Sequence, residues 1–264
     1  GRTLAAIYAS GSKKMTEGFG PKVSGFDHFE FGNHQSLKKK ITKDTAAIMV
    51  ETIMGEGGIK VIPDWCLREL RKICNKKNIL LILDEVQCGI GRSGDFFAFE
   101  KSKVKPDIVP IAKGIGGGFP IGALLMNKKV ASGMTVGTHG STFGGNPIAA
   151  AVAIAALKVV NDEHLIKNAR VLGKVFRNKL NEYIPTSNVA ILVRGRGLLN
   201  AIVINDTEES DTAWDICMAL RDNGLLAKPT HGNIIRFAPP LVINEAQLLD
   251  CVDIIIRTLK QFDR

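Results

Sequence analysis

Two apolar stretches of this 264-residue chain each end abruptly on side chains that can do chemistry. The first, 79–83, runs directly into Asp84 and Glu85, and the second, 108–112, runs directly into Lys113. Short apolar runs that end without a turn residue predict strands buried on both faces. Because open α/β sheets carry their functional groups at the carboxyl ends of parallel strands, we expect a carboxylate and an amine side by side.

Asp84 and Lys113 have the chemical character that one cofactor requires. A buried aspartate beside an electrophilic ring, and a lysine whose lowered pKa makes it a nucleophile, are the two side chains that pyridoxal phosphate chemistry needs. The residues between them include a literal GxGxxG at 89–94, which is also the pattern of dinucleotide-binding loops. The next stretch, 95–107, is short, rich in Phe and interrupted by Pro106, so it favours a tight loop over the long helix that a nicotinamide site needs. A nicotinamide oxidoreductase is therefore the weaker alternative.

The elements that position these residues alternate between strand and helix in the first part of the chain. A strand at 45–50 ending at Glu51, a helix from Pro63 and the strand at 79–83 form one crossover unit of a mostly parallel sheet. Hydrophobic spacing further along predicts a smaller α+β region after about residue 160. The other expected elements are helix 34–44, strand 119–126, an apolar helix from Pro147, helix 161–184, strand 198–204, helix 211–222, strands near 225–228 and 233–237, and helix 244–262.

The composition is that of a soluble globular protein, with 45% hydrophobic and 23% charged residues. No apolar window of about eighteen residues exists, so the sequence predicts no membrane association. The formal charge of +9 is dispersed apart from 38–40 and aromatic residues make up only 6%, which argues against nucleic acid and leaves attraction of anionic ligands. Five cysteines without CxxC spacing indicate reduced thiols in a cytosol-like compartment, and no metal site is expected.

Two further places in the sequence are candidates for binding anions. The loop at 137–147 consists of small, hydroxylated and glycine residues, so Ser141 or Thr142 is a candidate for a phosphate contact, although a plain helix-entry loop has the same composition. Arg236 lies inside an apolar strand, where a buried charge requires an anionic partner. That partner is either an acidic side chain or a substrate carboxylate, and the residues alone leave both open.

The segments ILDEVQCGIGRSG, AKGIGGGFP, THGSTFGGNP and RFAPPLVI, at their spacings in this chain, closely resemble the class III pyridoxal-phosphate aminotransferases. The nearest resemblance is to the acetylornithine and ornithine aminotransferase group, and it covers essentially the whole chain. It implies the fold-type I architecture, with a cofactor-binding large domain at 1–160 and a small C-terminal α+β domain at 161–264. It also implies amino acid and 2-oxo acid substrates, and a homodimer whose active site lies at the interface.

The resemblance implies a role for each matching residue around the cofactor, pyridoxal 5'-phosphate. Lys113 matches the lysine that forms the internal Schiff base and later moves the proton, and Asp84 matches the carboxylate that keeps the pyridinium nitrogen protonated. Val86 would pack on the ring face, and Gln87 would bond to the phenolic oxygen of the ring. Thr142, beside Ser141, matches the residue that reaches the cofactor phosphate of the neighbouring subunit.

Three residues match the substrate contacts of the family. Arg236 matches the arginine that takes the α-carboxylate of 2-oxoglutarate or glutamate through a bidentate fork. Glu56 matches the acid that neutralises this arginine while the other substrate is bound. Arg2, in the GRT motif, matches the group that takes the far carboxylate of ornithine-type donors. The implied reaction moves a terminal amino group to 2-oxoglutarate and gives a semialdehyde and glutamate.

The sequence departs from the family in two places. Where the family has VEPIQGEGG this chain has VETIMGEGG, with Thr52 and Met54, so the packing beside Glu56 is expected to differ. The chain also opens at the GRT motif, without an initiating Met, a signal-peptide layout or the phosphate-binding loop that precedes this motif in the family. An inactive fragment that serves only as a folding or dimerisation module is therefore the alternative from another class.

The two parts of the chain resemble aminotransferases that act on different amine donors. Residues 1–160 look more like acetylornithine aminotransferase, whereas RGRGLLNAIVI and NGLLAKPTHGNIIRFAPPLVI look more like ornithine aminotransferase. The half near the cofactor favours N-acetylornithine, with ornithine or another ω-amine as the alternative. The expected setting is arginine or other amino-acid metabolism in the cytoplasm, or in the mitochondrial matrix of a eukaryote.

Overall fold

The computed structural model describes residues 2–263, and the chain divides after Ala46 into two compact units. The described part of the first unit contains the short helices α1 (Leu4–Ala9), α2 (Lys13–Thr16) and α3 (His34–Lys40). The predicted helix at 34–44 ends earlier, at Lys40. It ends there because the Thr45 hydroxyl accepts the Thr42 N–H at 2.9 Å and the Thr42 hydroxyl accepts the Asp44 N–H at 3.2 Å, and such local bonds compete with a helix.

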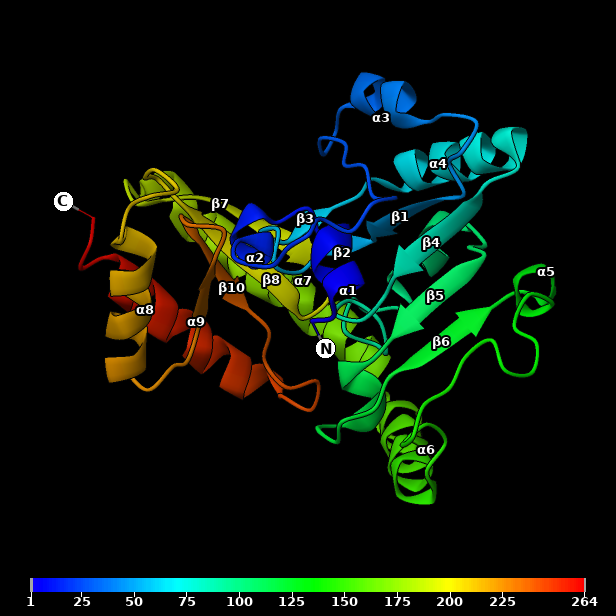
Figure 1. Ribbon diagram of the computed structural model, residues 1–264. Helices are drawn as coiled ribbons and strands as arrows, with labels where there is room; N and C mark the ends of the chain where they lie inside the picture. Colours follow the sequence, from blue (N-terminus) through cyan, green and yellow to red (C-terminus); the bar gives the residue numbers. More distant parts are fainter. Residues whose placement is uncertain (1, 264) are drawn as a thin grey trace. The chain divides into compact units, whose positions relative to one another are not determined.

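The second unit contains the sheet whose strands end at Asp84 and near Lys113. Its strand order is β1 (Ala47–Glu51), β4 (Leu80–Asp84), β5 (Ile108–Ile111) and β6 (Ala123–Met126), and Figure 1 shows these strands side by side. The pairs β1–β4 and β4–β5 are parallel, whereas β5–β6 is antiparallel. The predicted mostly parallel sheet is therefore confirmed, and the strands that end at Asp84 and near Lys113 are neighbours.

Helix α4 (Asp64–Lys77) makes the crossover from β1 to β4, as the sequence from Pro63 predicts. It buries Leu67, Leu70 and Cys74, which recur at helical spacing, and it ends at Asn78 in the left-handed conformation that commonly terminates helices. The predicted apolar helix is α6 (Pro147–Asp162), which the Asn146 side chain caps by accepting the Ala149 N–H at 2.9 Å. Within residues 2–263, no helix is long and apolar enough to cross a membrane.

A second, fully antiparallel sheet follows in the order β7 (Ala190–Arg196), β8 (Leu199–Ile204), β10 (Ile234–Phe237) and β9 (Lys228–Thr230). It packs with α7 (Leu165–Tyr183), α8 (Thr212–Asp222) and α9 (Glu245–Leu259). The remaining elements of this unit are β2 (Ile53–Met54), β3 (Lys60–Val61), η1 (Ala98–Ser102), η2 (Lys113–Gly116), α5 (Lys128–Ala131) and η3 (Ile184–Thr186). The predicted α+β region after residue 160 is present, while its boundary as a domain stays a prediction.

Both faces of the second sheet are buried, each against a different partner. Ile202, Ile204 and Ile235 belong to the core formed with the three helices. Ala201 and Ile234, which alternate with them, pack instead against residues of the loops that follow β1 and β4. Successive side chains of a strand point to opposite faces, so the sheet joins the helical core to the loops around the first sheet.

Sequence patterns missed several strands for identifiable reasons. The segment of β7 reads AILVRGR, and its two arginines and its glycine break the apolar alternation of a strand. The strands β2 and β3 have two residues each and depend on their mutual pairing. The strand expected near 225–228 lies at β9 instead, which includes Pro229, because β9 is an edge strand where a proline is tolerated.

Helix α7 approaches the turn between β7 and β8 so closely that one position admits only glycine. A Cβ atom on Gly173 would lie 1.9 Å from the backbone oxygen of Gly197, which itself has a φ of +57°. Backbone atoms on both sides leave no flexible side chain that can move away. The close packing of α7 on the second sheet therefore depends on Gly173.

We predict that Gly173→Ala lowers the free energy of unfolding by about 1–2 kcal/mol. The overpacking cost of about 1–3 kcal/mol for an inserted methyl group exceeds the helix propensity that alanine gains over glycine, about 1 kcal/mol, because the clash is with backbone. Gly133→Ala is the matched control, since its Cβ would meet only the Val130 oxygen at 3.4 Å. Urea unfolding of both variants measures the difference, and equal stability of the two would contradict the packing described.

Candidate active site

Asp84 and Lys113 lie at the same edge of the first sheet. Asp84 is the last residue of β4, and Lys113 follows β5 by two residues and begins η2. The Asp84 carboxylate accepts the N–H of Val86 at 2.8 Å, which fixes its orientation. Lys113 has a φ of +49°, a conformation that residues other than glycine rarely adopt and that recurs at functional sites. The expectation of a carboxylate and an amine at adjacent parallel strand ends is thus met by the topology.

The two groups influence each other's protonation. Burial raises the pKa of Asp84, while the Val86 N–H and the nearby Lys113 oppose that rise. Burial lowers the pKa of the Lys113 amine, Glu56 opposes this shift, and Arg236 adds to it. A lysine with a lowered pKa has more of its amine in the neutral, nucleophilic form near neutral pH than an exposed lysine has.

A third ionisable group, Glu51, belongs to the same edge. It is the last residue of β1 and the register partner of Asp84 in the parallel pair. Its carboxylate accepts the Gly55 N–H at 2.8 Å, and burial raises its pKa. The sequence placed Glu51 at a strand end but gave it no role, although it follows an apolar run in the same way as Asp84 and Lys113 do.

Arg236 on β10 faces this edge and binds an acidic side chain. Its Nη1 lies 2.8 Å from Oε1 of Glu56 and donates to Oε1 of Gln87 at 3.1 Å. The second oxygen of Glu56 lies 3.1 Å from Nζ of Lys228, which is on β9. The sequence left open whether the partner of Arg236 is an acidic side chain or a substrate carboxylate, and in the structure it is the acidic side chain of Glu56. Lys228 had no signal in the sequence, because its place depends on the register of β9 with β10.

The loop that carries Glu56 is held from several sides. The guanidinium of Arg194 donates to the backbone oxygen of Gly58 at 2.9 and 2.6 Å, and the Thr230 hydroxyl donates to the backbone oxygen of Glu56 at 2.7 Å. At the start of the loop, a Cβ on Gly55 would lie 2.3 Å from the side-chain amide carbon of Gln87, so glycine makes room for Gln87. The backbone around Glu56 is therefore fixed, and the carboxylate is the part that can move.

Glu85, the second acid after β4, points away from this edge and organises the following loop. It is fully buried and accepts the Thr52 hydroxyl at 2.7 Å, the Ala98 N–H at 2.8 Å and the Phe99 N–H at 3.2 Å. The Cys88 thiol donates at 3.4 Å to Oε2, the same oxygen that accepts the Ala98 N–H, and burial raises the pKa of this carboxyl. Thr52, one of the departures from the family pattern, therefore bonds to Glu85 rather than facing Glu56.

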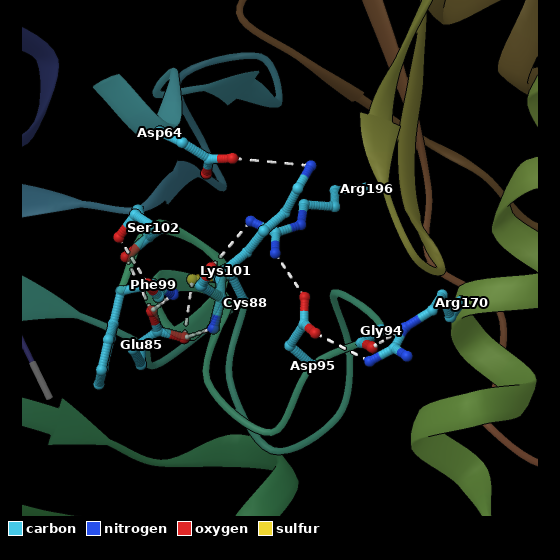
Figure 2. A network of polar contacts seen from close by, with 12 residues as sticks. Asp64, Glu85, Cys88, Gly94, Asp95, Phe99, Lys101, Ser102, Arg170 and Arg196 are labelled. Carbon is cyan, nitrogen blue, oxygen red and sulfur yellow. Dashed lines mark hydrogen bonds and ion pairs between the residues drawn. The ribbon is translucent and has the colours of Figure 1, made fainter. Parts of the chain in front are cut away.

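The glycine run at 89–94 leads into a loop that is tied to the second sheet and to α7, as Figure 2 shows. Asp95 pairs with Arg170 of α7 at 2.8 Å and also with Arg196 of β7. Arg170 donates to the Gly94 oxygen at 2.8 Å, and Arg196 donates to the Ala98 oxygen at 2.8 Å. The run opens no long helix, so the geometry of a dinucleotide site is not formed there and the tight-loop interpretation is confirmed.

Ser141 and Thr142 are exposed on the loop before α6, and no hydrogen bond of the described residues joins them to Asp84 or Lys113. Arg2 is exposed in the first unit. Val86 is half-buried, and its backbone supports Asp84 as described above. The structure therefore brings together Asp84, Gln87, Lys113, Glu56 and Arg236 of the residues that the sequence singled out.

Comparison with known proteins matches this chain and its fold to one family. The family model described as Aminotransferase class-III matches residues 1–259. The mitochondrial ornithine aminotransferase of Drosophila melanogaster is 47% identical over 98% of this chain and 59% of its own length. The acetylornithine aminotransferase of Mesorhizobium japonicum is 45% identical over 96% of this chain and 62% of its own length. The chain thus spans about three fifths of the length of these relatives.

Solved structures agree with the sequence comparison. The ornithine aminotransferase of Toxoplasma gondii superposes with a TM-score of 0.94 and 38% identity, over 99% of this chain and 62% of that protein. The acetylornithine aminotransferase of Elizabethkingia anophelis gives a TM-score of 0.79 and 52% identity, over 82% of this chain and 54% of that protein. A further Toxoplasma gondii structure, with a TM-score of 0.93, 39% identity, and coverage of 99% of this chain and 62% of that protein, has partial occupancy of pyridoxal phosphate at its active site.

A half-buried carboxylate and an amine at neighbouring strand ends of an α/β sheet are the arrangement that a pyridoxal-phosphate-dependent transferase requires. The chain belongs to the class III aminotransferases, whose cofactor is pyridoxal phosphate. The residues present fit the ring of that cofactor, because Asp84 is half-buried and held by a backbone N–H, Lys113 follows the neighbouring strand and has a lowered pKa, and Gln87 supplies an amide.

We predict that the bonds of Glu56 make part of the stability depend on pH. Arg236 and Lys228 overcome the effect of burial and lower the pKa of Glu56 from 4.5 to about 2. Because the folded pKa lies below the unfolded one, this contribution is fully present above about pH 4.5 and is lost as the pH falls towards about 2. The side chain is 47% exposed, so solvent screening keeps the effect at about 1 kcal/mol or less.

Urea unfolding of the wild-type protein and Glu56→Gln from pH 6 to pH 3 measures this contribution. We expect the wild type to be the more stable protein near pH 6 and the difference to shrink as the pH falls. Glu182→Gln, which removes an exposed pair with Lys179, controls for the loss of a surface glutamate. A difference between wild type and Glu56→Gln that stays constant over this range would contradict the assignment.

Proposed function

We propose that this chain carries the catalytic pair of an ω-transaminase, which moves the terminal amino group of N-acetylornithine or ornithine to 2-oxoglutarate and gives a semialdehyde and glutamate. The observation that carries the proposal is the placement of Asp84 and Lys113 at neighbouring strand ends, with Arg236 and Glu56 facing them. The names of the relatives support the two donors, since ornithine and acetylornithine aminotransferases are both similar over nearly the whole chain.

The cofactor-proximal residues have separate tasks in this proposal. When bound, pyridoxal phosphate supplies an electron sink for the substrate carbon that loses a proton. Asp84 holds a proton on the ring nitrogen through its negative charge, and its orientation is set by the Val86 N–H. Lys113 anchors the cofactor, then, once displaced by substrate, takes and returns the proton as a neutral amine. Val86 packs on the ring, and Gln87 binds its phenolic oxygen.

Arg236 and Glu56 separate the two half-reactions. With Glu56 at 2.8 Å, Arg236 is neutralised and offers no free cation, so a donor is bound through contacts that present its terminal amine. Glutamate or 2-oxoglutarate displaces Glu56 and takes Arg236 through its α-carboxylate, which presents the α-position instead. Arg2 is proposed to take the far carboxylate of the donor.

The resemblance of the first half of the chain to acetylornithine aminotransferases leads us to propose N-acetylornithine as the preferred donor. Ornithine is the second candidate, because the segments around β8 and β10 resemble ornithine aminotransferases. We propose a setting in amino-acid metabolism such as arginine biosynthesis, in the cytoplasm or a mitochondrial matrix. The five cysteines, which are all free thiols in the structure, support a reducing compartment.

A homodimer with the active site at its interface is the proposed assembly. The loop before α6 and the outer face of that helix expose Phe143, Ile148 and Ile154, which are 81%, 68% and 62% exposed. Apolar side chains clustered on one element favour burial against a partner. In this assembly Ser141 and Thr142 serve the cofactor phosphate of the neighbouring subunit, which agrees with their exposure away from Lys113.

We predict that the complete protein develops a visible absorption band on addition of pyridoxal phosphate and that Lys113→Ala abolishes the band and the activity. Lys167→Ala, at another lysine of the second unit, is the control and keeps both. N-acetylornithine, ornithine and 4-aminobutyrate are then added in separate experiments, and the rate at which each removes the band ranks the three donors. A Lys113→Ala protein with an unchanged spectrum would overturn the proposal. A 264-residue chain that neither binds the cofactor nor turns over substrate, while a longer chain does both, would favour the folding-module alternative.

We predict that Ile154→Asp weakens the dimer at least tenfold, since a charge replaces an apolar contact at the interface core. Sedimentation equilibrium measures the dissociation constant. Val171→Asp, at another exposed apolar position, on α7, is the control for a surface charge. An unchanged dissociation constant in Ile154→Asp would place the interface elsewhere, and a monomeric wild type would remove the proposed assembly.

A further inference from the structure

The ion pair of Glu56 with Arg236 is called the gate: it is closed when the two are paired and open when a substrate carboxylate has taken Arg236. Glu56 is bound by two cations at once, one on each of its carboxylate oxygens. Oε1 lies 2.8 Å from Nη1 of Arg236, and Oε2 lies 3.1 Å from Nζ of Lys228. Arg236 and Lys228 are directly opposite each other in the antiparallel pair of β10 and β9. Side chains at such paired positions lie on the same face of the sheet, so the register places both cations against the same carboxylate.

The two cations differ in what else they face. Arg236 is 17% exposed and also bonds to Gln87, whose position follows Asp84 and Val86, so it lies on the side of the cofactor residues. Lys228 is 58% exposed and lies on the edge strand β9. The same strand also fixes the backbone of Glu56 through the Thr230 hydroxyl at 2.7 Å. β10 therefore presents the cation that a substrate needs, and β9 holds the acid that must give way.

We propose that Lys228 is a positioning residue of the gate: it keeps its ion pair with Glu56 when a substrate carboxylate takes Arg236, and so stabilises the open gate. The inference rests on the proposed function, because it concerns the substrate that competes with Glu56 for Arg236. Glu56 then exchanges one of two partners instead of becoming unpaired. This exchange favours the binding of 2-oxoglutarate and glutamate. It does not favour the binding of the amine donor, because the gate is closed in that half-reaction.

A lysine that only strengthened the closed gate would have the opposite effect. If Lys228 mainly held Glu56 against Arg236, its removal would loosen that pair and 2-oxoglutarate would bind more tightly. If Lys228 holds Glu56 in the open state, its removal leaves Arg236 as the remaining cation for Glu56, and 2-oxoglutarate binds more weakly. The direction of the change in affinity therefore decides between the two roles.

The experiment compares Lys228→Met with wild type in the complete protein, using KM values for 2-oxoglutarate and for the amine donor. We expect the ratio of the first KM to the second to rise about two- to fivefold, the size of a partly exposed ion pair. Lys228→Arg restores the ratio because it keeps the charge. Lys179→Met is the matched control, since it removes a lysine from a similarly exposed pair with Glu182. An unchanged or lower ratio in Lys228→Met overturns the proposal.

A double-mutant cycle tests whether Lys228 acts through Glu56. In a Glu56→Gln background, Lys228→Met is expected to cause no further change in the KM ratio. A change that persists there would show that Lys228 contacts the substrate itself, and it would overturn the positioning role.

Binding of glutarate, measured by calorimetry, gives a readout that does not need turnover. We expect Lys228→Met to weaken it by the same factor, and Lys179→Met to leave it as in wild type. If wild type binds glutarate with this dependence on Lys228 but shows no transamination, the proposed function fails while the gate remains. If transamination occurs and neither readout depends on Lys228, only the gate inference fails.

Discussion

The parallel pairing of β1, β4 and β5 brings Glu51, Asp84 and Lys113 to one edge of the first sheet, and the rest of the site depends on how the two acids are held there. Both carboxylates are half-buried, and partial burial of a charge is costly unless the group finds a partner. Asp84 accepts the Val86 N–H, and Glu51 accepts the Gly55 N–H. Each strand-end acid thus bonds to the backbone of the turn that follows it. The same bonds that offset burial also shape the turns that carry Gln87 and Glu56.

The second sheet supplies Arg236 to the site. It can do so because one of its faces packs on the helices and the other packs on the loops of the first sheet. Ile235 and Phe237 pack into the helical core, whereas Ile234 packs towards the loops after β1 and β4. Arg236 lies two residues from Ile234, so the alternation of a strand turns its guanidinium towards Glu56. The ion pairs of Asp95 with Arg170 and Arg196 tie the loop after Asp84 to α7 and β7. Arg236 and Lys113 are therefore carried by different sheets that are held in one arrangement.

The sequence predicted the parts of this arrangement that depend on local pattern. Apolar runs that end on charged residues located the strand ends, and an arginine within an apolar strand predicted an anionic partner, which the structure shows as Glu56. The apolar run before them did not by itself separate Asp84 from Glu85, and the family resemblance selected Asp84. Their different environments follow from the contacts of Glu85 with Thr52 and Ala98. The sequence also could not find Lys228, whose role follows from strand register. The phosphate contact of Ser141 and Thr142, and the role of Arg2, stay predictions, because they require a partner subunit or a fixed placement of the first unit.

We propose that Lys113 is the amine that holds the cofactor beside Asp84. To test this, the protein is loaded with pyridoxal phosphate and reduced with borohydride, and the modified lysine is located by mass spectrometry of its peptides. We expect one cofactor per chain, on the peptide that contains Lys113. Attachment at another lysine, or modification spread over many surface lysines with none preferred, would contradict it.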